Sequence, residues 1–237
     1  MPVAYNLIIN YEAGWWMVDK AIYIILSIFD AAAMLALMCK LYRLPILMYA
    51  KRMSILVLII AVVSYLLRIR LSLPYFDLPM QYVIFVLFFR YIIKMRFHYA
   101  AFIVAAGFIT FTNIQLLVYY FYTATGAANS TILAAVSGIA VYIVQISTEA
   151  VVFVLCFLLW RFGYGWSFII LPPHNFAKKE KYTGFNMELI VSTIISVVVI
   201  VATVVFLHDG NSFPLIILVF ICFGVSYYLS KKGEMEP

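Results

Sequence analysis

Seven long apolar runs, each about 20 residues or more, constrain this chain more than any other feature. They occupy residues 17–39, 53–71, 78–96, 99–123, 130–160, 186–208 and 212–230. A helix needs roughly 20 mostly apolar residues to cross the hydrocarbon core of a bilayer. The runs therefore predict an all-α fold: a polytopic transmembrane helix bundle of seven spans, forming a single transmembrane domain over residues 1–237. The longest run, 130–160, is expected to tilt or to extend past the bilayer.

The composition excludes several classes of protein. Of the 237 residues, 67% are hydrophobic and only 11% are charged, whereas about 25% of an average soluble domain is charged. A water-soluble protein with this composition would expose apolar patches well beyond a few hundred Å². Soluble enzymes, nucleic-acid binders and disordered chains are excluded. We expect the lipid bilayer to be the main partner. The protein is expected to be a multi-pass protein of a cell membrane, namely the bacterial cytoplasmic membrane.

The segments between the runs predict the orientation. Residues 40–52 carry four basic and no acidic side chains, 161–185 carry a net +3, and two lysines follow the last run, whereas 124–129 carry no charge. Because basic loops stay in the cytoplasm, the N-terminus is predicted outside and the C-terminus inside, with 161–185 as a cytoplasmic loop. Arg68 and Arg70, beside Asp77, are the exception, since this topology places them outside.

Three ionisable residues stand out because the predicted spans place them at membrane depth: Asp30, Arg90 and Glu149. Charge at this depth is costly, so such residues are functional candidates. Their distances from the basic ends of their helices predict that all three meet in the inner half of the bundle, as one intramembrane charge network. The alternative is structural, because buried polar groups also hold helices together.

Polar side chains also follow helical stripes. Tyr23, Ser27 and Asp30 are spaced by four and three residues, as are Tyr142, Gln145 and Glu149 in the reverse order, so each set shares one helix face. A ligand is predicted to enter from the outer side between the third, fourth and fifth spans and to contact polar side chains of the fourth and fifth. These are Asn113, Gln115, Tyr119, Tyr142 and Gln145.

Signatures of catalysis are missing from the sequence. It contains no HExxH, GxSxG or CxxC motif and no glycine-rich phosphate loop. Cys39, Cys156 and Cys222 lie within apolar runs, which is typical of buried thiols. We therefore expect no enzymatic activity, no metal and no cofactor.

The layout resembles the membrane sensor region of Gram-positive peptide-pheromone receptor histidine kinases. The matching features are the short outer loops at 74–79 and 124–129, the outward-opening polar stripes, and the basic exit at 227–232. The resemblance implies a receptor that binds an extracellular or membrane-borne ligand, such as a small peptide, and passes a helix rearrangement to a cytoplasmic output. In those receptors a kinase region follows the membrane module, and a longer native protein would be needed to supply it here.

Two other functions fit the same sequence. Asp30 and Glu149 would serve a small cation- or proton-coupled transporter or channel as a carboxylate pair. Alternatively, the bundle is a scaffold subunit that only holds other proteins in the membrane. Under the receptor hypothesis, the expected partners are a cytoplasmic or membrane signalling protein and a second copy of the chain.

Overall fold

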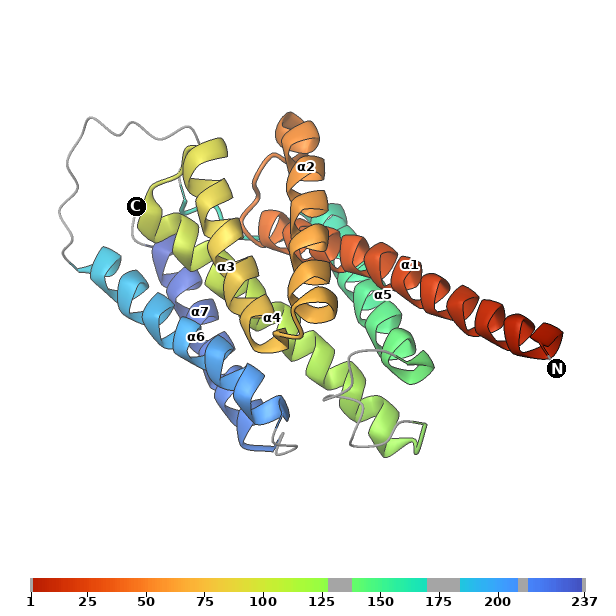
Figure 1. Cartoon of the computed structure of the whole chain (residues 1–237). Helices are drawn as coiled ribbons and strands as arrows, with labels where there is room; N and C mark the ends of the chain where they lie inside the picture. The colour runs from red at the N-terminus through yellow and green to blue at the C-terminus, as the bar shows by residue number, and fades with distance from the viewer. Residues whose placement is uncertain (1, 128–137, 170–183, 209–212, 236–237) are drawn as a thin grey trace.

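The computed structural model describes residues 2–127, 138–169, 184–208 and 213–235. Side chains are described for residues 20–127, 138–169, 184–203 and 215–235. Seven α-helices form the bundle (Figure 1). They are α1 (Pro2–Leu41), α2 (Ile46–Tyr65), α3 (Asp77–Leu87), α4 (Phe97–Ala124), α5 (Ile139–Phe162), α6 (Phe185–His208) and α7 (Phe213–Met235). Two π-helical turns, Leu66–Arg70 and Phe88–Ile92, extend α2 and α3, and a short 3₁₀ turn, Pro74–Phe76, precedes α3. The all-α prediction is confirmed for these residues.

Helix α4 is the centre of the bundle. It packs against α1 and α5 on one side and against α6 and α7 on the other, and α3 also rests on it (Figure 1). Of its most apolar 18 residues 78% are buried, compared with 28% for α2. Small residues allow this close packing: a Cβ on Gly107 would lie 2.3 Å from Cγ of Met38 on α1.

The prediction of seven spans is wrong at the third run, 78–96. Among the described residues, six helices are long and apolar enough to cross a membrane: Lys20–Leu41, Ile46–Arg70, Phe97–Ala124, Ile139–Phe162, Phe185–Thr203 and Leu215–Met235. Helix α3 has 11 residues and its π turn five. At 1.5 Å per residue they reach roughly 24 Å, less than the hydrocarbon thickness of about 30 Å. The chain turns sharply after Ile92, where Lys94 has a φ of 63°.

Other helix boundaries also differ from the predicted runs. Helix α1 begins at Pro2 instead of residue 17, and α2 begins at Ile46 instead of residue 53. Lys51 and Arg52 therefore lie within the first two turns of α2. Lysine and arginine are good helix formers, so they do not interrupt it. The segments 130–137 and 170–183, from the predicted fifth span and cytoplasmic loop, lie outside the described residues.

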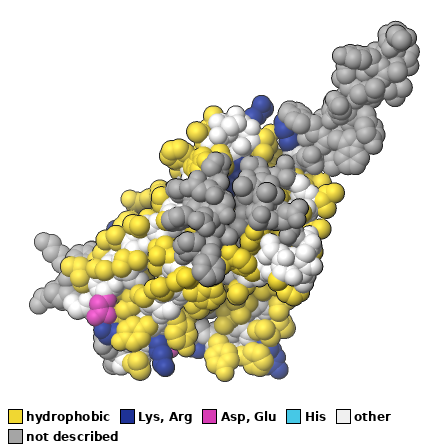
Figure 2. All heavy atoms as spheres, turned by 90° about the horizontal axis from the view of Figure 1, so that it is seen from below, with side chains coloured by type: hydrophobic (Ala, Val, Ile, Leu, Met, Phe, Trp, Pro, Cys, Tyr) yellow, Lys and Arg dark blue, Asp and Glu magenta, His cyan; other side chains and the backbone are white. Residues whose placement is uncertain are grey.

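The sides of the bundle are apolar. Large hydrophobic side chains are exposed along several helices, including Leu58 on α2, Phe157 on α5, Ile194 on α6 and Ile221 on α7. In the view from below, yellow hydrophobic side chains outnumber the charged ones among the coloured residues (Figure 2). A surface of this kind fits contact with lipid rather than with water. The fold thus supports the coarser prediction of a multi-pass membrane protein.

The two ends of the bundle carry different charges. Basic residues gather where α1, α3, α5 and α7 end, which we call the basic end; they include Lys40, Arg43, Lys51, Arg52, Lys94, Arg96, Arg161, Lys231 and Lys232. Hydrogen bonds tie this end together, as Nη2 of Arg43 lies 2.6 Å from the Gly163 carbonyl oxygen. The opposite end, where α3 and α5 begin, is called the cavity end below. Under the positive-inside rule the basic end is predicted to be cytoplasmic.

Candidate functional site

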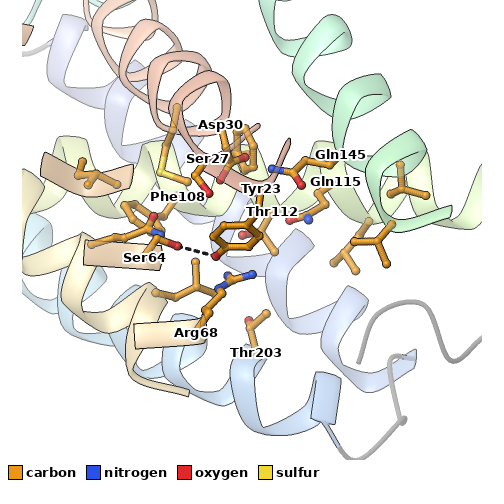
Figure 3. Close-up of a pocket in the computed structure, with 18 residues that line it drawn as sticks. Tyr23, Ser27, Asp30, Ser64, Arg68, Phe108, Thr112, Gln115, Gln145 and Thr203 are labelled. Atoms are coloured by element: carbon orange, nitrogen blue, oxygen red, sulfur yellow. Dashed lines mark hydrogen bonds between the residues drawn. The ribbon is translucent and has the colours of Figure 1, made fainter. Parts of the chain in front are cut away.

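A polar cavity of about 180 Å³ lies among the helices at the cavity end (Figure 3). Five helices and one π turn supply most of its wall, and α6 adds Thr203. Its polar lining consists of Tyr23, Ser27, Asp30, Ser64, Arg68, Gln81, Thr112, Gln115, Gln145 and Thr203. Its apolar lining includes Phe108, Phe111, Ile60 and Val144. Polar atoms at this depth avoid lipid by facing an interior space.

An ion pair closes one side of the cavity. Nε of Arg68, in the turn that ends α2, donates to Oδ2 of Asp77, the first residue of α3. Asp77 is completely buried, and it also accepts hydrogen bonds from Oγ of Ser64 and Nε2 of Gln81, both at 3.0 Å. This carboxylate is therefore neutralised and well satisfied, as a buried charge must be. The pair also fixes the chain between α2 and α3.

Tyr23 connects α1 to that ion pair. Its hydroxyl oxygen lies 3.0 Å from Oγ of Ser64 (Figure 3). Because Ser64 donates its proton to Asp77, Tyr23 is the donor to Ser64. Asp30, two helical turns further along α1, lines the same cavity and interacts electrostatically with Arg68 and Asp77. The predicted stripe of Tyr23, Ser27 and Asp30 thus faces the cavity as one surface.

Helices α4 and α5 contribute two amides. Gln115 and Gln145, both predicted as ligand contacts, line the cavity and point toward Asp30 in the close-up (Figure 3). Glu149, one turn beyond Gln145, is buried and within hydrogen-bonding range of the Gln145 side chain. The charges of Glu149 and Asp30 are close enough to interact. The structure therefore brings together two members of the predicted charge network.

The other predicted residues lie elsewhere. Asn113 donates to the carbonyl oxygens of Ile109 at 2.9 Å and of Val219 on α7 at 3.3 Å, so it faces α7. Tyr119 is buried, with its ring centroid 5.1 Å from that of Tyr120. Neither these two nor Tyr142 is among the described residues that line the cavity.

Arg90 does not occupy the place that the sequence suggested. Its Nη1 donates to the carbonyl oxygen of Met95 at 3.1 Å, in the turn after α3. Arg90 lies 13 residues from Asp77, about 20 Å along the helix axis, so it belongs near the basic end. The cation that acts on Asp30 is instead Arg68. The predicted topology placed Arg68 and Asp77 on the outer side, and opposite charges flanking a short turn with Pro74 could have indicated their pairing.

At the basic end, α1 leads into a dense aromatic cluster, which we call the aromatic junction: Tyr42, Trp166, Phe168 and Tyr227. The ring of Trp166 lies 5.6 Å from those of Tyr42 and Tyr227, and its backbone N–H donates to the Leu41 carbonyl at 2.7 Å. The hydroxyl groups of Tyr42 and Ser230, on α7, are 3.2 Å apart. Burial raises the pKa of the Tyr42 hydroxyl. This junction links α1, α7 and the segment after α5.

No family model, no curated protein and no solved structure matches this chain. The resemblance to receptor kinases therefore stays a prediction, and the cavity, the ion pair and the junction are the features that bear on function. In the part of the chain that the structure describes, no group of three or more His, Cys, Asp or Glu side chains is placed to hold a metal ion.

Proposed function

We propose that this protein is a membrane-embedded sensor that binds a small ligand in the cavity and passes a helix rearrangement to the basic end. The observation that supports this most directly is that α1 builds both sites. Tyr23, Ser27 and Asp30 line the cavity, and Leu41 at the other end of α1 holds the Trp166 backbone. About 17 Å of continuous helix separates Asp30 from Leu41, the residue before Tyr42 of the junction.

The cavity volume limits the ligand. Ligand pockets commonly enclose about 300–1,000 Å³, whereas a cavity of about 150 Å³ suffices for a ring the size of benzene. A volume of about 180 Å³ therefore favours a small molecule. A peptide, expected from the resemblance, would insert one side chain or one end.

Signalling requires that the ligand bind one arrangement of helices more tightly than another. In this proposal the ligand bridges α1 to the amides of α4 and α5, at Gln115 and Gln145. A shift of α1 relative to α4 then changes the packing of Tyr42 against Trp166. The bundle performs no chemistry itself, and a signalling partner reads the basic end.

Trp166 provides the test. We would replace Trp15, Trp16 and Trp160 with Phe, reconstitute the full chain in nanodiscs, and record Trp166 emission while adding amino acids, alkylamines, short carboxylic acids and sugars. At least one compound should shift the emission. The cavity-filling variant Thr112→Phe should abolish the shift, while Ser54→Phe, an exposed position on α2, should keep it. Compounds that raise the unfolding temperature without changing Trp166 emission would contradict the sensor proposal.

A second candidate, cation- or proton-coupled transport, has one specific observation in its favour. Oε1 of Glu149 is buried without a hydrogen-bond partner among the described residues, and its charge interacts with that of Asp30. Two carboxyl groups so arranged are suited to exchange a proton or cation. Liposomes containing a pH dye or a membrane-potential dye separate the candidates. Flux that Glu149→Gln abolishes, with Glu188→Gln as the control, would favour transport over sensing.

A further inference from the structure

The charges around the cavity do not cancel. Asp30 and Arg68 are the charged side chains among the described residues of its lining. Arg68 already forms its ion pair with Asp77, which is fully buried and has no other counter-ion among the described residues. The positive charge of Arg68 is thus largely neutralised before any ligand arrives. The negative charge of Asp30 is left over.

Asp30 also lacks a fixed partner. Within the described part of the chain it makes no hydrogen bond and no salt bridge within 4.0 Å, although Arg68 and Asp77 influence it from further away. Glu149 adds a second acidic group behind it. A carboxylate facing an interior space without a counter-ion is costly. A cation inside the cavity would remove that cost.

Aromatic side chains surround the same space. Tyr23, Phe108 and Phe111 line the cavity together with Asp30. The ring of Phe108 is fixed by edge contacts with Phe85 and Tyr82, at 5.8 and 5.9 Å between ring centroids. Aromatic faces attract cations, and aromatic walls beside a carboxylate are the usual means of binding alkylated ammonium groups. An inorganic cation would gain less from such walls, because it prefers several oxygen ligands.

We propose that the ligand of this cavity is a small organic ammonium compound. Its cationic nitrogen lies beside the Asp30 carboxylate, its alkyl groups contact Tyr23, Phe108 and Phe111, and any polar remainder reaches the amides of Gln115 and Gln145. A free carboxylate is disfavoured because Arg68, the cation of the lining, is already paired. This inference rests on the proposed function only in taking the cavity as the ligand site.

Calorimetric titration of the full chain in nanodiscs tests the charge requirement. The probes are choline, its neutral carbon analogue dimethylbutanol, and acetate. Choline should bind, and dimethylbutanol and acetate should bind at least tenfold more weakly, which corresponds to about 1.4 kcal/mol. Choline that binds no better than either of the others, or does not bind at all, would overturn the ammonium assignment without reference to any variant.

Two variants locate the binding site. Asp30→Asn should weaken choline binding at least tenfold, whereas Glu188→Gln, which removes an acid at the basic end, should leave it unchanged. If Asp30→Asn does not fold, Phe108→Leu should weaken choline more than dimethylbutanol. Equal choline affinity in the folded variants and the wild type would overturn the proposal. Choline binding without a Trp166 response would contradict the sensor proposal but not the ammonium proposal. A Trp166 response to acetate but not to choline would contradict the ammonium proposal but not the sensor proposal.

Discussion

The cavity end and the basic end of this bundle bury polar groups in opposite ways. At the cavity end, Asp77 and Arg68 form an ion pair beside an open space, and Asp30 faces that space without a partner. At the basic end, the aromatic junction fills the interior, and its ion pair, Lys232 with Glu188 at 2.7 Å, lies at the surface. The helices thus enclose a polar space at one end, whereas aromatic side chains pack between α1, α7 and the segment after α5 at the other. Substitutions at the two ends should therefore differ in their cost to stability.

The largest effect is expected from Arg68→Met. It leaves the Asp77 carboxylate buried without its counter-ion, which should lower the free energy of unfolding by about 3–5 kcal/mol. Equilibrium unfolding in mixed micelles, followed by circular dichroism, measures this loss. The double variant Arg68→Met with Asp77→Asn should recover a large part of it. An unchanged unfolding curve for Arg68→Met alone would show that Asp77 is not charged or not enclosed.

The second effect concerns the basic end. Gly165 has a φ of 138°, and a Cβ there would lie 2.7 Å from the carbonyl oxygen of Lys40. Gly165→Ala should therefore destabilise the protein by about 1–3 kcal/mol through strain and displacement. Gly163→Ala, two residues earlier with a φ of 66° and no atom within 4 Å of an added Cβ, serves as the matched control. It should cost only about 1–2 kcal/mol, and the same unfolding measurement should rank Gly165→Ala as the more damaging.

Two tyrosines with hydroxyl partners compare the two ends directly. Tyr42→Phe removes the hydroxyl that pairs with the fully buried Ser230, and should cost about 1 kcal/mol. Tyr23→Phe removes the partner of Ser64, but water in the cavity can replace it, so its cost should be smaller. Unfolding temperatures of the two variants give the ranking. A greater loss for Tyr23→Phe would contradict an accessible cavity.

The smallest effect is expected at the surface of the basic end. Glu188→Gln breaks the exposed pair with Lys232. Exposed ion pairs contribute about 0–1 kcal/mol, so the unfolding temperature should scarcely move, and any change should vanish in high salt. A loss as large as that of Tyr42→Phe would mean that this end depends on its charges instead of its aromatic packing.

The sequence predicted those parts of the site that helical periodicity alone determines. Tyr23, Ser27 and Asp30 share a face because of their spacing, and polar residues within an apolar helix turn away from lipid. Gln145 was identified for the same reason, whereas Gln115 was identified as a polar residue within the apolar run 99–123. The helices themselves were predictable from their apolar runs, apart from α3, which is too short to be a span by itself.

Neighbouring helices decided what the sequence could not. Asn113 and Gln115 are two residues apart, so they point to different sides of α4 and cannot share a site. Because other helices pack on both sides of α4, either residue was equally suited to an interior contact, and only the position of α7 places Asn113 against Val219. The pairing of Arg68 with Asp77 likewise depends on the turn between α2 and α3, which periodicity does not describe.

The most direct test of the account is the accessibility of Gln115 to a water-soluble thiol reagent. In a background without Cys39, Cys156 and Cys222, we would introduce Gln115→Cys or its control Asn113→Cys and treat reconstituted protein with methanethiosulfonate ethylammonium. We expect rapid labelling at position 115, slower labelling by the anionic sulfonate reagent, protection by choline, and no labelling at position 113. Equal labelling at both positions, or none at position 115, would contradict a solute-accessible cavity at this end of the bundle.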